Sequence, residues 1–286
     1  HEKALYDRQL RVWGHAAQQR LKQSTVLLLH PSGVSLEIAK NLVLAGIGEL
    51  RIAGMHRVCN NDDLQDSVFV TRKDVAEQAG YIPTLTREMA KLNTNVTVSS
   101  LVLADGSIQI LQEHLRSTKT DVLILSRALE YHTSTPTPSP NEAESSNRCV
   151  SACAQAAEAA GAVFVWADIA GMFGAMFLNA SSWHKGVVEG VPRIPFGQSL
   201  AALSESSATR SRKCSGLGRP LSEALTKGRD GLWTKLAGVT FPPVASVVGG
   251  LGSREVTTIV TGVGQIAGNF MFSDMTQNAV YIEKHE

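Results

Sequence analysis

Short apolar runs alternate with amphipathic segments along most of the chain. The runs at 26–29, 122–125 and 163–166 contain no polar residue, which is typical of parallel strands that are buried on both faces. The segments between the runs carry apolar residues three and four positions apart, which indicates helices. Strands that alternate with helices predict right-handed βαβ crossovers and a mostly parallel sheet flanked by helices.

The first of these units is the clearest. We expect a helix over residues 6–23, a second helix over 34–45 that ends at Gly46, and a strand over 50–53. The other expected elements are helices at 84–93, 108–117, 149–160 and 244–260, a strand at 96–103, a strand or hairpin at 171–183, and a hairpin in the C-terminal tail. Three prolines within 133–147 predict a mobile surface loop, and the Ser- and Arg-rich segment 206–218 predicts a linker.

Composition excludes several classes of partner. The net charge is 27 − 26 = +1, so we expect no nucleic-acid partner. No apolar run is long enough to span a bilayer, and we expect no signal peptide and no membrane partner. The four cysteines fit a reducing compartment. Cys149 and Cys153 lie four apart on an expected helix, either as half of a metal site or, as we favour, as buried thiols.

The turn after the first strand has the position of a dinucleotide phosphate loop but lacks its glycines. The G-x-G-x-x-G window reads His30-Pro31-Ser32-Gly33-Val34-Ser35, so only the intermediate Gly33 remains. Pro31 also removes an N–H donor. Gly54 stands where an acidic residue usually ends the second strand and binds the ribose. An α/β domain without a bound nucleotide is therefore the preferred interpretation, and we assign no cofactor-binding residue.

Two further groups suggest chemistry of their own. His30 ends a strand and suggests catalysis, but no carboxylate lies near it in sequence, so we expect it to fill the former phosphate pocket. Asp62, Asp63 and Asp66 could bind a hard cation. Solvated charges or helix caps are the preferred interpretation of these three residues, and we assign no metal site.

Three segments carry a resemblance to a known family: YDRQLRVWG at 6–14, LEIAKNLVLAGIGEL at 36–50 and PVASVVGGLGSREVTTIVTG at 243–262. They resemble the non-catalytic subunits of the heterodimeric activating enzymes for ubiquitin-like proteins. The resemblance implies a Rossmann-like adenylation fold of the ThiF/MoeB type with an antiparallel C-terminal extension. It divides the chain into a degenerate adenylation domain (1–183), a variable linker or short insertion (184–238), and a helix and hairpin that complete the same domain (239–286).

In that family, the degenerate subunit contributes an arginine from its N-terminal helix to the active site of its partner. Arg8 matches this arginine, which would neutralise charge on phosphate oxygens. The alternative is that Arg8 only pairs with Asp7 or another acid on the helix. The resemblance places ATP and magnesium in the catalytic partner subunit, gives that partner most of the contact with the modifier, and implies a location in the nucleus and cytoplasm.

The residues of the family's active subunit are replaced at each position that we can match. Asp63 and Asp66 replace the asparagine and the arginine of the loop. Residues 76–80, where the family has a lysine, contain none, and residues 126–129, where it has the magnesium-binding aspartate, contain no aspartate. In the late helix, Arg254 replaces a glutamine, which is a minor departure beside the others. These replacements favour a subunit that is inactive alone over a free-standing nucleotide enzyme such as a dehydrogenase or an adenylyltransferase.

The compact length between Trp183 and Val239 favours the SUMO-type subunit, since the Nedd8-type subunit carries a large helical insertion there. A Nedd8-type subunit and a purely structural pseudoenzyme scaffold remain the alternatives.

Overall fold

The computed structural model describes residues 5–103, 108–126, 140–180 and 239–283, apart from residues 269 and 277. For 140–149, 281 and 283 it describes the backbone only. The strands are β1 (Thr25–Leu29), β2 (Glu49–Met55), β3 (Thr97–Leu103), β4 (Val122–Ser126), β5 (Val163–Ala170), β6 (Phe173–Asn179), β7 (Phe270–Asp274) and β8 (Ala279–Glu283). The helices are α2 (Asp7–Lys22), α3 (Gly33–Ala45), α4 (Asn61–Asp66), α5 (Arg72–Ala76), α6 (Tyr81–Ala90), α7 (Ile108–Ser117), α8 (Pro140–Ala159) and α12 (Pro242–Thr261).

The described strands form one sheet in the order β3-β2-β1-β4-β5-β6-β7-β8. Strands β1 to β5 are parallel to their neighbours, whereas the β5–β6, β6–β7 and β7–β8 pairs are antiparallel. The expected α/β fold with an antiparallel C-terminal extension is confirmed. The strand order reverses between β1 and β4, and ligands of open α/β sheets bind at the carboxyl ends of the strands at such a point.

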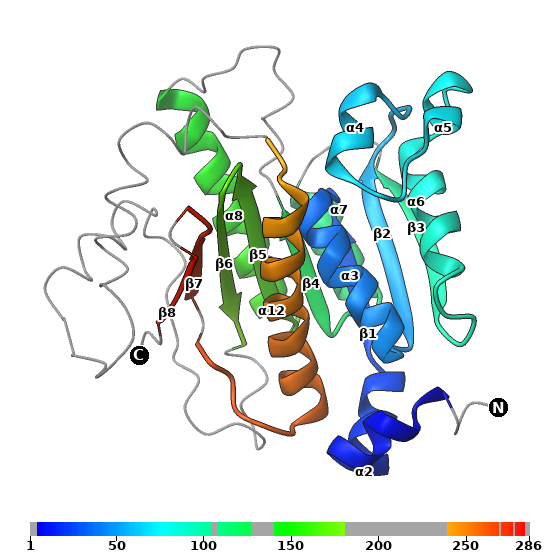
Figure 1. Cartoon of the computed structure of the whole chain (residues 1–286), viewed down its shortest axis with the longest axis vertical. Helices are drawn as coiled ribbons and strands as arrows, with labels where there is room; N and C mark the ends of the chain where they lie inside the picture. The colour runs from blue at the N-terminus through cyan, green and yellow to red at the C-terminus, as the bar shows by residue number, and fades with distance from the viewer. Residues whose placement is uncertain are drawn as a thin grey trace, which may run out of the picture.

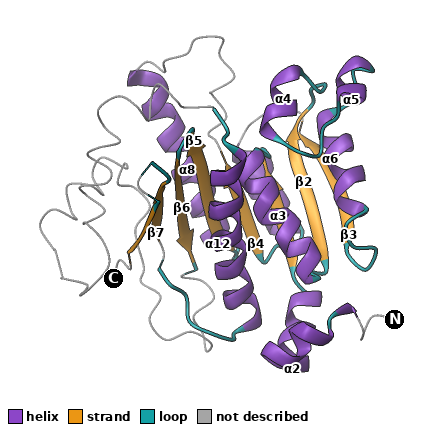
Figure 2. Cartoon of the chain, viewed as in Figure 1, coloured by secondary structure: helices purple, strands orange, loops and turns teal. Residues whose placement is uncertain are grey.

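Helices cover both faces of this sheet (Figures 1 and 2). Alternate residues of β1 show the two faces. Val26 and Leu28 belong to the core formed with α3, α6 and α12, whereas Leu27 and Leu29 belong to the core formed with α7 and α8. The C-terminal part of the chain completes this domain: β7 and β8 extend the sheet, and α12 packs in the core beside α3. None of the described helices is both long and apolar enough to cross a membrane.

Three expectations differ from the structure. The expected helix at 6–23 is bent, because Gly14 adopts φ 81° and ψ 171° inside α2. The expected loop at 133–147 is wrong from Pro140 onward, where α8 begins; proline suits a first helical position, which needs no N–H donor. The helix expected at 84–93 spans Tyr81–Ala90. The linker expected at 184–238 lies outside the described residues.

Candidate functional site

The degenerate phosphate loop lies where β1 ends and α3 begins. Ser32 is the N-cap of α3, and its extended backbone presents the first free N–H groups of the helix to this end of the sheet. In a dinucleotide-binding domain these groups and the helix dipole hold the phosphates. The groups that occupy this position decide what the site can bind.

A closed chain of serine hydroxyls occupies the loop. The Ser32 hydroxyl donates to the Ser126 hydroxyl at 2.8 Å, and the Ser126 hydroxyl donates to the Ser35 hydroxyl at 2.6 Å. Ser35 in turn donates to the carbonyl of Ser32 at 3.1 Å and accepts from its N–H at 3.0 Å. All three side chains are buried. Since Ser32 and Ser35 stand at two fingerprint positions, these hydroxyls bond to one another in the place where glycines admit a phosphate.

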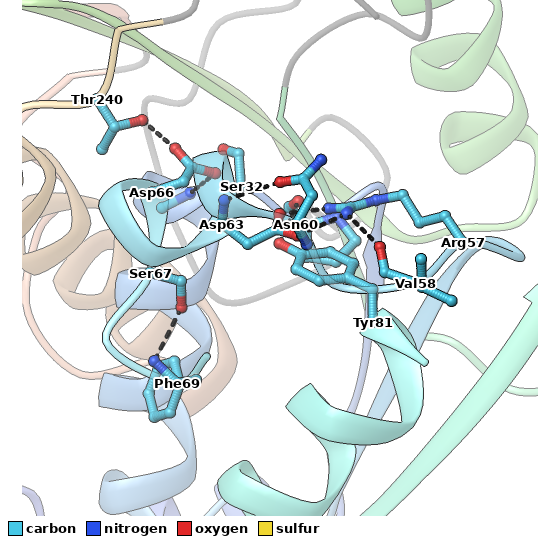
Figure 3. Close-up of polar contacts among 12 residues, drawn as sticks. Ser32, Arg57, Val58, Asn60, Asp63, Asp66, Ser67, Phe69, Tyr81 and Thr240 are labelled. Carbon is cyan, nitrogen blue, oxygen red and sulfur yellow. Dashed lines mark hydrogen bonds and ion pairs between the residues drawn. The ribbon is translucent and has the colours of Figure 1, made fainter. Parts of the chain in front are cut away.

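A carboxylate binds the N-terminus of α3. Asp66, the last residue of α4, accepts a hydrogen bond from the N–H of Gly33 at 3.1 Å through one carboxylate oxygen. Its other carboxylate oxygen accepts from the hydroxyl of Thr240, as Figure 3 shows. A bridge between Gly171 and Thr240 fixes the backbone of that segment. The negative charge that a helix N-terminus attracts is therefore supplied by the chain itself.

The contact between α4 and α3 leaves no room for a side chain at Gly33. A Cβ atom on Gly33 would lie 2.3 Å from the carbonyl oxygen of Asp66. The retained glycine of the loop thus serves the approach of the protein's own backbone, in the way that the second glycine of the fingerprint serves the approach to a pyrophosphate.

The ribose side of the former pocket is filled by apolar atoms. A Cβ atom on Gly54 would lie 2.8 Å from the Cδ1 atom of Ile82 and 3.8 Å from the ring of Pro31. Gly54 and Ile82 are both buried. A carboxylate at position 54 would have to displace Ile82, so the loss of the acidic residue and the packing of α6 against β2 belong to one arrangement.

An ion pair fixes α4 beside this site (Figure 3). The Arg57 guanidinium donates to both oxygens of Asp63 at 2.7 Å and lies 3.4 Å from the centre of the Tyr81 ring. Burial is the largest single influence on the pKa of Arg57 and acts to lower it, but the hydrogen bond to Asp63 and the nearby negative charges together outweigh it, and the pKa is raised. Tyr81 donates to the carbonyl of Pro31 at 3.3 Å. The pair therefore links the α4 segment to the degenerate loop.

The structure shows how the acidic and sulfur-containing residues singled out in the sequence are placed. Asp63 caps α4 together with Asn60, which confirms the preferred interpretation for that residue. Asp66 binds the start of α3, and the expectation that His30 fills the former phosphate pocket stays a prediction. His30 is half-buried with a left-handed backbone (φ 49°). Within the described residues no three metal-binding side chains gather. Cys153 is buried, as expected, and the side chain of Cys149 lies outside the described atoms.

Arg8 lies at the opposite end of the sheet. Tyr6 contacts Gly46, which ends α3, whereas Asp66 contacts Gly33, which begins it. The helix α3 runs from Gly33 to Ala45. At the rise of an α-helix this length separates the two ends by about 20 Å, far more than the length of an arginine side chain. Figure 1 shows α2 and α4 at opposite ends of the sheet. Arg8 therefore cannot contact an anion at the degenerate loop of its own chain.

The side chain of Arg8 is exposed on the first segment of α2. Asp7 pairs with Arg11 at 2.9 Å, and across the described part of the chain no hydrogen bond or ion pair holds the guanidinium of Arg8. In this structure Asp7 thus pairs with Arg11 rather than with Arg8. Leu5 is 60% exposed and Val12 is 74% exposed. Val12 lies four residues after Arg8 in the same helical segment and therefore shares its helical face, whereas Leu5 precedes the N-cap residue Tyr6.

Fold and site together define a doubly wound α/β domain with an antiparallel extension, whose nucleotide-binding end is occupied by its own side chains. The chain belongs to the ThiF family, whose sequence profile matches residues 6–285. This confirms the expected family.

Relatives and solved structures agree with this assignment. The chain is 40% identical over 99 residues to DNA damage tolerance protein rad31 of Schizosaccharomyces pombe, covering 35% of this chain and 31% of that protein. It is 48% identical over 61 residues to SUMO-activating enzyme subunit 1 of Xenopus laevis (21% and 18%), and 30% identical over 129 residues to that of Dictyostelium discoideum (45% and 37%). The matched segments thus span less than two-fifths of these relatives. A crystal structure of E. coli MccB with ATP shares the fold at a TM-score of 0.65 and 14% identity, covering 98% of this chain and 71% of that one.

Sequence reasoning did not find the pairing of Asp66 with Gly33 and Thr240. The residues lie 33 and 174 positions from Asp66, and no local pattern connects them. One signal was available: an acidic residue stands where the family's active subunit has an arginine. A reversal of charge beside a former phosphate site indicates that the anion has moved into the protein.

Proposed function

We propose that the chain is the non-catalytic subunit of a heterodimeric activating enzyme for a ubiquitin-like modifier, with SUMO as the modifier. In this proposal Arg8 enters the ATP site of the catalytic partner and stabilises charge on the phosphates while the C-terminus of the modifier is adenylated. ATP and magnesium belong to the partner, which also makes most of the contact with the modifier. The complex would act in the nucleus and cytoplasm.

The observation that carries the proposal is the separation of Arg8 from the filled loop. An exposed guanidinium that cannot reach its own pocket is available to a second molecule. Leu5 and Val12 beside Arg8 supply exposed apolar surface of the kind that interfaces bury. The names of the relatives support SUMO as the modifier.

The test uses the purified heterodimer and pyrophosphate exchange driven by the modifier. Arg8→Ala is expected to lower kcat about 100-fold, because a charge-stabilising group acts in the transition state. Arg11→Ala is the matched control, since it removes the same side chain from the same helical segment, and it should retain wild-type kcat. Equal activity of Arg8→Ala and wild type would contradict the role of Arg8 and leave the structural pseudoenzyme scaffold as the better hypothesis.

The choice of modifier needs a separate experiment. Complexes recovered from cells through this chain should contain a subunit with an intact G-x-G-x-x-G loop and a catalytic cysteine. Exchange assays with SUMO and with Nedd8 should show activity with SUMO alone. Activity with Nedd8 alone would replace the proposed modifier and leave the role of Arg8 in place.

A further inference from the structure

The helical arm that carries Arg8 is too short to be ordered by itself. Gly14 has non-helical backbone angles, with a positive φ and an extended ψ, so Asp7–Trp13 is separate from the rest of α2. Isolated helices of this length are not stable in water. Contacts with the body of the protein must therefore decide where the guanidinium of Arg8 lies.

Tyr6 supplies the first contact. Its ring is buried, and its hydroxyl accepts a hydrogen bond from the side-chain amide of Asn93 at 2.7 Å. The same amide nitrogen donates to the carbonyl of Val43 at 2.9 Å. Gly46 has a left-handed backbone, and a Cβ atom there would lie 2.5 Å from the Tyr6 hydroxyl. The absence of a side chain at Gly46 thus makes room for the ring against the end of α3.

Trp13 and Gln18 supply the second contact, on the other side of Arg8. The indole N–H of Trp13 donates to the amide oxygen of Gln18 at 2.9 Å, across the bend at Gly14. The amide nitrogen of Gln18 donates to the carbonyl of Ala45 at 3.2 Å. Both ends of the arm are therefore fixed to the last turn of α3, and Arg8 lies between them.

We infer that Tyr6 and Asn93 act as a positioning clamp for Arg8, holding its guanidinium ready before the partner's nucleotide arrives. The inference rests on the proposed function. A preordered arm saves the conformational entropy that ordering it in the transition state would cost. Tyr6 does not touch the nucleotide in this scheme, so its effect on adenylation must pass through Arg8.

A double-mutant cycle in the heterodimer tests the clamp. Tyr6→Ala is expected to lower kcat for pyrophosphate exchange about tenfold or more with little change in the KM for ATP. Tyr6→Phe retains the ring, and its kcat should be lower than that of the wild type by no more than about threefold, since the variant loses a single hydrogen bond. In the Arg8→Ala background, Tyr6→Ala should cause no further loss, because its effect acts through Arg8. Arg20→Ala is the control: it removes contacts with the carbonyl of Thr261 beyond the bend and should leave kcat unchanged.

The outcomes separate this inference from the proposed function. If Arg8→Ala lowers kcat and Tyr6→Ala does not, the clamp is wrong and the role of Arg8 stands. If the two losses multiply in the double variant, Tyr6 acts independently of Arg8 and the clamp is also wrong. If Arg8→Ala has no effect, the proposed function itself fails. Activity is measured per assembled heterodimer, and Asn93→Ser, which removes the donor from outside the arm, replaces Tyr6→Ala should that variant not assemble.

Discussion

At the scale of single residues, one carboxylate decides the character of the former nucleotide site. Asp66 accepts from the N–H of Gly33 and from the hydroxyl of Thr240. A phosphate placed at the same N-terminus would meet this negative charge at close range, where repulsion is strongest. The substitution of an acid for the family's arginine thus removes a ligand for phosphate and also supplies the anion that the helix needs.

Removal of this carboxylate should weaken the fold. Asp66→Ala leaves the N–H of Gly33 and the hydroxyl of Thr240 without their acceptor, and loss of a helix cap costs about 1 kcal/mol. Urea denaturation of the purified chain measures the difference. Asp62→Ala on the exposed side of α4 is the matched control and should be near neutral. Equal stability of the two variants would contradict the capping role.

A second buried carboxylate makes stability depend on pH. Asp74 accepts from the Thr71 hydroxyl at 2.5 Å and from Arg87 at 2.7 Å, and these bonds lower its pKa from 3.8 to about 2. Because folding lowers this pKa, the unfolded chain binds the proton more tightly than the native state. The stabilisation is therefore complete above the unfolded pKa and is lost as the pH falls towards about 2.

The free energy of unfolding of Asp74→Asn should accordingly lie below that of the wild type at neutral pH, and the gap should narrow between about pH 5 and pH 3. Denaturant titrations of both proteins across this range measure the gap. An unchanged gap would show that hydrogen-bond geometry rather than charge stabilises α5.

At the scale of elements, two helical glycines differ in whether the backbone requires them. Gly14 bends α2 with φ 81°, a backbone angle that is unfavourable for residues other than glycine. Gly250 lies within α12 and has nothing within 4 Å of an added Cβ. The same substitution should therefore have opposite effects at the two sites.

Gly14→Ala should lower the free energy of unfolding by about 1–3 kcal/mol, because it places a side chain at a positive φ with an extended ψ, a combination that is essentially restricted to glycine. Gly250→Ala should raise it by about 0.5–1 kcal/mol, since alanine has the higher helix propensity. Thermal or urea unfolding of both variants gives the signs. Stabilisation by Gly14→Ala would show that the bend in α2 is not maintained in solution.

At the scale of the whole molecule, one end of the sheet is filled by the protein's own side chains and the opposite end exposes a charged group. The carboxyl end is closed by the serine hydroxyls, Asp66 and Ile82, and the other end presents Arg8 on an anchored arm. This difference predicts that the isolated chain does not bind a nucleotide.

Calorimetric titration of the isolated chain with ATP and magnesium should therefore show no binding, whereas the heterodimer should bind ATP at a single site. The closed loop is the physical reason, because its donors are already bonded to protein acceptors. Binding to the isolated chain would contradict the assignment of the nucleotide to the partner and would restore the free-standing enzyme as the better hypothesis.

The sequence by itself determined the fold and the loss of the phosphate loop. Buried parallel strands need uninterrupted apolar runs, and a phosphate loop needs glycine at fixed spacing, so both leave a local pattern at 26–29 and 30–35. It also singled out Arg8 through the motif around it.

Only the tertiary structure decided what replaced the lost site and where Arg8 lies. Gly54 contacts Ile82, which is 82 − 54 = 28 positions away. Asp66 accepts from Thr240, which is 174 positions away. Such contacts depend on how helices pack across the sheet. A local sequence pattern does not encode them, because each partner alone is an ordinary aspartate, glycine or tyrosine.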